Sequence, residues 1–176
     1  EGAIRPTLSG SRLAYVLPEG SGQALYLRDL DTGTSTRVTG VSATYDISGP
    51  SLSPTALAWA RNAGNGSSIW VRNLAAGRQR QIARSTRGTL LMTPSVYGNR
   101  IAWISQNGEV AARSKIVVAT LGGKGQRTIA TIVSRTDILW GTSLTPSSVY
   151  TTRWNPFNAT ALGTQPIGRV VRYAVR

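Results

Sequence analysis

The segment Pro50-Ser-Leu-Ser-Pro-Thr-Ala-Leu-Ala-Trp-Ala60 recurs along this chain of 176 residues, and its spacing determines the predicted fold. It returns 44 residues earlier at 6–16 and 44 residues later at 94–104. A weaker fourth copy occupies 142–152, after a step of 48 residues. A period of this length indicates repeated units, each of which buries one face against the next.

Two further motifs follow each copy. The first is an apolar segment at 24–30, 68–74, 115–121 and 169–175. The second motif occupies 36–39, 80–83 and 127–130, in each case after a turn that contains Gly. The fourth copy stops before this motif. All these segments are short, rich in β-branched and aromatic residues, and bounded by Gly, Pro, Ser and Asn, which is typical of strands.

The pattern predicts an all-β fold with almost no helix, because no window shows a sustained period near 3.6 residues. Four strands in a unit of about 44 residues are typical of a β-propeller blade. We expect a single β-propeller domain or propeller fragment of about four antiparallel four-stranded blades, the fourth of them incomplete. The predicted blades are approximately 1–43, 44–88, 89–137 and 138–176.

The quoted segment, followed by Ser68-Ile-Trp-Val-Arg-Asn-Leu-Ala-Ala-Gly77 and Arg80-Gln-Ile82, resembles the TolB-type, WD40-like β-propeller repeat. That family usually carries Asp-Gly at the turn after the first strand, and this chain departs from it in every copy. The corresponding triplets are Gly10-Ser11-Arg12, Pro54-Thr55-Ala56, Gly98-Asn99-Arg100 and Pro146-Ser147-Ser148. The resemblance implies a periplasmic, secreted or cell-surface protein.

The number of predicted strands leaves three architectures open, since natural propellers usually close with 4 to 8 blades. The chain could be part of a six- to eight-bladed propeller. It could be a compact four-bladed ring. It could also be a subunit whose open blade is completed by a neighbour's strand, because an unpaired edge favours assembly.

Composition excludes several classes of site. The chain has no His and no Cys, which removes disulfides, Cys/His zinc sites and every His-dependent triad, and we expect no cofactor and no metal. Its apolar runs are too short to span a bilayer. The net charge of +13 is uneven: residues 1–60 carry four basic and five acidic residues, whereas 61–176 carry 16 and two. This gradient favours a polyanionic neighbour.

Two groups of residues are weak binding candidates. Trp140, Trp154 and Phe157 break the repeat, and 154–157 lie in a predicted irregular connection, where binding residues often occur. The densest basic run has four members on the predicted outer strand of the second blade and in the following loop. They are Arg78, Arg80, Arg84 and Arg87. They either contact a polyanion or protect an edge strand, and no specific nucleic-acid motif accompanies them.

Other recurrent residues have structural interpretations. Tyr15, Trp59 and Trp103 share one repeat position, which predicts packing between blades. Asp29 and Asp31 are expected to cap a turn. The inner strands carry hydroxyls that would surround a central channel, namely Thr7, Ser9, Ser51, Ser53, Ser95, Tyr97, Ser143 and Thr145.

The sequence favours a non-catalytic interaction module that binds a protein or polymer partner through loops on one face. The alternatives are a structural subunit that assembles into a dimer or filament and, third, a sugar- or polyanion-binding protein. Seven carboxylates are few for glycosidase or lyase chemistry.

Overall fold

The computed structural model describes residues 3–86, 88–107, 113–134, 137–154 and 168–175, and this part of the chain contains strands but no helix. The strands form four antiparallel sheets, in each of which neighbours in sequence pair. The first sheet contains β1 (Ile4–Ser9), β2 (Arg12–Glu19), β3 (Gly22–Asp29) and β4 (Ser35–Val41). The second contains β5 (Tyr45–Leu52), β6 (Ala56–Ala63), β7 (Gly66–Asn73) and β8 (Gln79–Arg84).

The third sheet contains β9 (Thr89–Tyr97), β10 (Arg100–Asn107), β11 (Arg113–Thr120) and β12 (Arg127–Val133). The fourth contains β13 (Ile138–Leu144), β14 (Ser148–Trp154) and β15 (Gly168–Ala174), so three strands of it fall in the described residues. The predicted all-β, propeller-like fold is confirmed.

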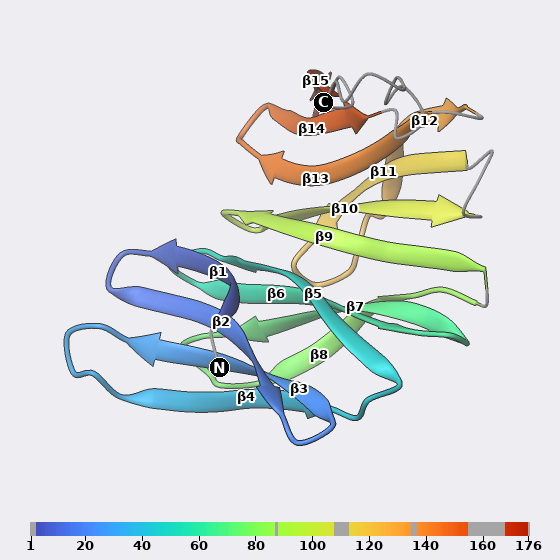
Figure 1. Cartoon of the computed structure of the whole chain (residues 1–176). Coiled ribbons are helices and arrows are strands. Elements are labelled where there is room, and N and C mark those ends of the chain that lie inside the picture. Colours follow the sequence, from blue (N-terminus) through green and yellow to red (C-terminus); the bar gives the residue numbers. More distant parts are fainter. Residues whose placement is uncertain (1–2, 87, 108–112, 135–136, 155–167, 176) are drawn as a thin grey trace, which may run out of the picture.

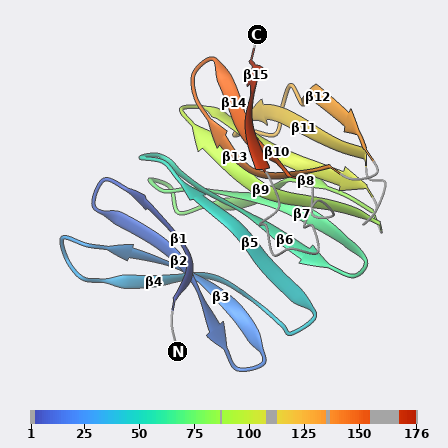
Figure 2. The same cartoon turned by 45° about the horizontal axis from the view of Figure 1, so that its top comes forward.

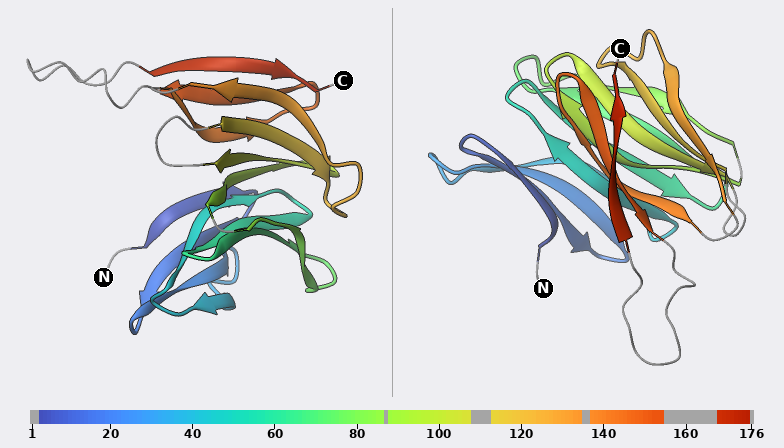
Figure 3. Two further views of the ribbon diagram at one scale, coloured as in Figure 1. Left: turned by 90° about the vertical axis from the view of Figure 1, so that its right-hand side faces the viewer. Right: turned by 90° about the horizontal axis from the view of Figure 1, so that it is seen from above.

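The sheets follow one another as an open arc. The first and fourth sheets lie at opposite ends, with the second and third between them (Figures 1 and 2). The side view in Figure 3 shows the same separation of the two ends. Within the described residues, the four sheets therefore do not close on themselves as a compact ring.

Apolar side chains fill the space between neighbouring sheets. Trp59 faces the first sheet and is 1% exposed, and Trp103 faces the second sheet and is 2% exposed. The predicted packing role of this repeat position is thus confirmed for both. Tyr15 holds the same position in the first sheet but is only partly buried, because no sheet covers that face. Ile104, Ile116 and Val149 are fully buried between the third and fourth sheets.

A hydroxyl on each of the first three inner strands links its sheet to the next. The backbone N–H of Leu52 donates to Thr7 Oγ1 (3.3 Å), that of Val96 to Ser51 Oγ (3.1 Å) and that of Leu144 to Ser95 Oγ (2.8 Å). Ser53 and Thr145 instead bond within their own turns, to Ala56 and Ser148. Five of the hydroxyls expected around a channel thus make structural bonds.

The inner strands begin earlier than the recurrent segments. The recurrent segments begin at a Pro, or at Thr142 in the fourth copy, whereas β1, β5, β9 and β13 start two to five residues before that position. The residue before it has a left-handed backbone, with φ of 55° at Arg5, 53° at Gly49, 47° at Thr93 and 71° at Gly141. The strand pairing shifts register there in every sheet. This bulge takes the position of the Pro, which has no backbone N–H to donate, out of the regular pairing, so that the strand continues on both sides of it.

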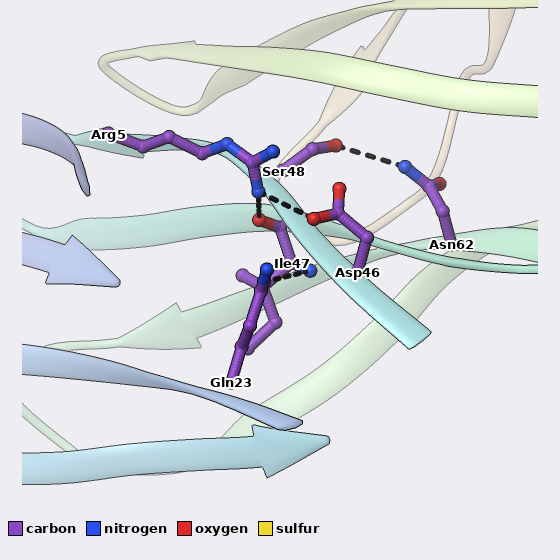
Figure 4. Close-up of polar contacts among 6 residues, drawn as sticks. All are labelled: Arg5, Gln23, Asp46, Ile47, Ser48 and Asn62. Carbon is purple, nitrogen blue, oxygen red and sulfur yellow. Dashed lines mark hydrogen bonds and ion pairs between the residues drawn. The ribbon is translucent and has the colours of Figure 1, made fainter. Parts of the chain in front are cut away.

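Polar side chains fasten the first sheet to the inner strand of the second (Figure 4). Arg5 donates to Asp46 Oδ1 (2.8 Å) and to the Ile47 carbonyl. The N–H of Ile47 donates to Gln23 Oε1 (3.1 Å). β1 and β3 are therefore both held to β5.

Candidate functional site

A groove lies between the second and third sheets, at the end that carries the β5–β6, β7–β8 and β9–β10 turns. We call this end of all four sheets the turn face. The groove has a volume of about 740 Å³. Its lining residues come from both sheets, and they are Thr55, Ala56, Val71, Asn73, Ala76, Arg78, Gln79, Arg80, Gly98, Asn99 and Leu121.

Two of the predicted basic residues meet in this groove. Arg78 lies in the turn after β7, and Arg80 lies on β8. Both are exposed, and neither forms an ion pair with a carboxylate of the described residues. One guanidinium nitrogen of Arg80 donates to the Leu121 carbonyl (2.9 Å), which places this charge at the junction of the two sheets. The groove thus offers two unneutralised cations.

The groove exists because one repeat position differs between sheets. At the start of β2, Arg12 donates to the Pro54 carbonyl of the next sheet (3.4 Å), and at the start of β10, Arg100 donates to the Pro146 carbonyl (3.2 Å). The corresponding residue at the start of β6 is Ala56. Between the first and second sheets the matching space is divided into two recesses of about 350 and 400 Å³, and Arg12 lines both of them.

The charges of the groove and of these two recesses also differ. Between the first and second sheets, Arg12 lies beside Asp29. Backbone N–H groups of Thr32 and Asp31 donate to the Asp29 carboxylate (3.0 Å each) and, with the nearby charge of Arg12, lower the pKa of Asp29. The predicted turn-capping role of Asp29 is confirmed. In the second sheet its place is taken by Asn73, which caps its turn with an uncharged amide (2.8 Å to the Ala76 N–H).

The other two arginines of the basic run do not join this groove. Arg84 is the last residue of β8, at the opposite end of the strand, in a smaller recess of about 250 Å³ with Tyr45 and Arg61. Arg87 lies outside the described residues. The run therefore does not form one basic surface.

The aromatic candidates lie in the fourth sheet or outside the described part of the chain. Trp140 is on β13, with 57% of its surface exposed, on a face that no further sheet covers. Trp154 ends β14, and its side chain is outside the described residues, as is the whole of Phe157. The structure does not bring Trp140 together with Arg78 or Arg80.

Sequence reasoning missed the apolar and amide residues of the groove, namely Ala56, Val71, Asn73, Asn99 and Leu121. The signal was present in the repeat, since Ala56 stands where two other copies have Arg. Its meaning required knowing that the Arg reaches the next sheet.

The described residues contain no group of three or more acidic, His or Cys side chains that could hold a metal ion. The same residues form no helix that is long and apolar enough to cross a membrane.

No family model and no curated protein matches this chain. Solved structures do. A TolB-type protein of Agrobacterium tumefaciens aligns with a TM-score of 0.63 at 16% identity, over 100% of this chain and 60% of that one. The β-propeller domain of the Trilobed protease from Pyrococcus furiosus aligns with a TM-score of 0.62 at 12% identity, over 99% and 56%. An oligogalacturonate lyase from Vibrio parahaemolyticus aligns with 0.61 at 11% identity, over 93% and 47%.

These likenesses show a TolB-like β-propeller fold. At such identities they carry no information on activity, because one fold hosts many functions. The chain spans about half of the length of these structures.

Proposed function

We propose that this TolB-like β-propeller chain is a non-catalytic interaction module that binds a protein partner through its turn face. The groove with Arg78 and Arg80 carries the proposal, because it combines a concave apolar surface with polar groups that could orient a ligand. Loops and turns on a rigid scaffold are where propellers and other folds place their binding residues.

The use of the carboxylates supports a non-catalytic role. Asp46 pairs with Arg5, Glu19 with Arg37 and Asp137 with Arg153. Asp29 caps its turn. These acids are thereby committed to structural contacts, whereas general acid and base catalysis needs carboxylates that reach a substrate.

The likeness to TolB-type propellers supports an extracytoplasmic location, which is part of the proposal. The neighbours named above include a protease domain and a lyase, so the same fold also occurs in enzymes. Turnover of peptide and oligogalacturonate substrates tests the non-catalytic role. Activity that stays with the chain through purification to homogeneity would contradict the proposal.

A display selection tests the binding face. Random-sequence peptides would be selected for binding to the whole chain. Their affinity would then be measured for the wild type and for two matched variants. Asn99→Trp places a bulky ring in the β9–β10 turn at the groove, and Asn65→Trp places one in the β6–β7 turn at the opposite end. We expect Asn99→Trp to weaken the selected peptides roughly tenfold or more and Asn65→Trp to leave them unchanged. Equal binding to both variants would contradict the proposal.

A second candidate function, self-assembly, is favoured by the two ends of the arc. Ser143 on β13 holds the position of the bridging hydroxyls, and Leu8 on β1 holds that of the Leu52 and Val96 donors. Leu8 is 62% exposed, and Val170 at the other end is 73% exposed. Each end thus carries one half of a sheet-to-sheet contact.

Light scattering across a concentration series tests this second function. If the chain assembles, its mass in solution should rise above 18.7 kDa as the protein concentration increases. Leu8→Glu should suppress this rise, because it places a charge on the exposed apolar end. A folded chain that stays at 18.7 kDa at every concentration would contradict it.

A further inference from the structure

We infer that the groove between the second and third sheets binds an acidic peptide segment. One carboxylate would pair with Arg78 and Arg80, and a neighbouring apolar side chain would pack on Ala76 and Leu121. The inference rests on the proposed function, because it names the chemistry that the turn face recognises.

The first argument is that the groove is a space which the repeat normally fills. In the flanking copies, Arg12 and Arg100 cross to a carbonyl of the next sheet. At the second sheet the crossing side chain is reduced to Ala56, and Gly98, which corresponds to the carbonyl residues Pro54 and Pro146, lines the groove. The groove is thus one continuous space of about 740 Å³, whereas Arg12 lines two separate recesses at the matching place between the first and second sheets.

The second argument is charge. The two recesses between the first and second sheets are lined by Arg12, Asp29 and Asp31, so their combined formal charge is 1 − 2 = −1. The groove holds Arg78 and Arg80 without a lining carboxylate, so its formal charge is +2. The residues that match these two arginines in the first sheet are Thr34 and Thr36. The substitutions therefore replace a site that carries its own carboxylates by one whose net positive charge favours an anion.

The third argument is the apolar part of the surface. Ala56 and Val71 are buried at the floor of the groove, and the accessible apolar lining comes from Ala76, which is exposed, and Leu121, which is half-buried. Apolar ligand surface placed here gains about 25 cal/mol for each Å² removed from water. An inorganic ion would leave this surface unused, whereas an acidic residue beside an apolar one uses both parts.

The shape favours a peptide over a nucleic acid. A volume of about 740 Å³ suits a ligand of a few residues. A nucleic acid requires a track of phosphate contacts. The next arginine of β8 is Arg84, which lies four residues beyond Arg80 and thus roughly 13 Å along the strand, at the other end of the sheet.

The test uses an array of short peptides in which every acidic member has a partner with Asn and Gln in place of Asp and Glu. Fluorescence anisotropy would measure their binding to the whole chain. We expect acidic peptides to bind and their amide partners to bind roughly tenfold more weakly or worse, because an ion pair is replaced by neutral hydrogen bonds.

Three variants locate the site. Ala56→Met fills the groove without adding charge, and the double variant Arg78→Gln, Arg80→Gln removes the cations. Each should weaken the acidic peptides roughly tenfold or more. Arg84→Gln removes the same charge from the opposite end of β8 and should leave binding unchanged. The urea midpoint of each variant checks that it is folded.

The outcomes separate the inference from the proposed function. Acidic peptides that bind Ala56→Met as tightly as the wild type, or an array in which no acidic peptide binds, would overturn the inference. A different outcome is that single-stranded DNA displaces the peptides from the wild type and fails to bind Ala56→Met. That result would identify the ligand of the groove as a nucleic acid and would also overturn the inference. If uncharged peptides bind the wild type and no longer bind Asn99→Trp, the proposed function stands and this inference does not.

Discussion

The first and second sheets are built from the same repeat, but one has a neighbour on one face and the other on both. In the second sheet, Trp59 stacks on Trp70 with ring centroids 6.4 Å apart, beneath the first sheet. In the first sheet, Tyr15 stacks on Tyr26 at 5.8 Å, on a face left uncovered. Stacking across paired strands is common to both, whereas the polarity of the ring follows its exposure.

The residues around each aromatic pair differ in the same way. Tyr26 donates to Glu19 (2.9 Å), and Arg37 pairs with the same carboxylate. The matching positions of the second sheet are Ala63, Trp70 and Gln81, which carry no charge. Equivalent repeat positions thus carry a charged network around the Tyr pair and uncharged side chains around the buried Trp59.

The largest difference should follow removal of the rings. Trp59→Ala should lower the free energy of unfolding by about 3–5 kcal/mol, because it empties a buried site, and Tyr15→Ala by about 1 kcal/mol. Urea denaturation measures both. Trp59→Phe provides a folded intermediate if the alanine variant does not fold. Equal losses at the two positions would show that the uncovered face is not exposed in solution.

The bulges of the inner strands offer the next comparison. A Cβ on Gly49 would lie 2.7 Å from the Thr93 Cα in a left-handed backbone, so Gly49→Ala should destabilise the chain by about 2 kcal/mol or more.

Thr93→Gly should have the opposite sign at the matching position. It relieves the same backbone conformation and removes a buried hydroxyl that has no partner in the described structure, for a gain of about 1 kcal/mol. Thermal and urea unfolding check the sign. A destabilised Thr93→Gly would mean that the bulge is not strained.

The crossing arginine should have a smaller effect. Arg12→Ala removes the bond to Pro54 and the packing of the arginine stem, and should cost about 1 kcal/mol. Arg78→Ala removes an exposed arginine without such a bond and serves as the matched control. Similar urea midpoints for the two variants would remove the distinction between the filled and the open recess.

The smallest effect concerns pH. Hydrogen bonds from Arg37 and Tyr26 lower the pKa of Glu19. A lowered pKa in the folded state contributes stability above the ordinary pKa of the carboxyl and loses it as the pH falls through the folded value. Glu19→Gln should therefore be slightly less stable than the wild type at neutral pH and equal to it in acid. Urea midpoints that differ by the same amount at both pH values would contradict this.

The repeat and its sheets were readable from the sequence because apolar segments and turn residues recur at fixed spacing. The bulge at Thr93 was not, since a threonine before a Pro gives no sign of a left-handed backbone. The separation of Arg80 from Arg84 was implicit in the rise of a strand but lost when the arginines were read as one run. The groove depended on a contact between sheets that no local pattern encodes.

The bridging hydroxyls have a geometric consequence. Thr7, Ser51 and Ser95 fix how close neighbouring sheets come along their innermost strands. Farther from the axis, the bulk of side chains such as Trp59 and Arg12 then sets how far each sheet is rotated from the one before. The number of blades in a closed propeller is a full circle divided by the rotation from one sheet to the next. Related chains could thus keep the same inner strands and still build propellers with different numbers of blades, by exchanging a few wedge-forming residues.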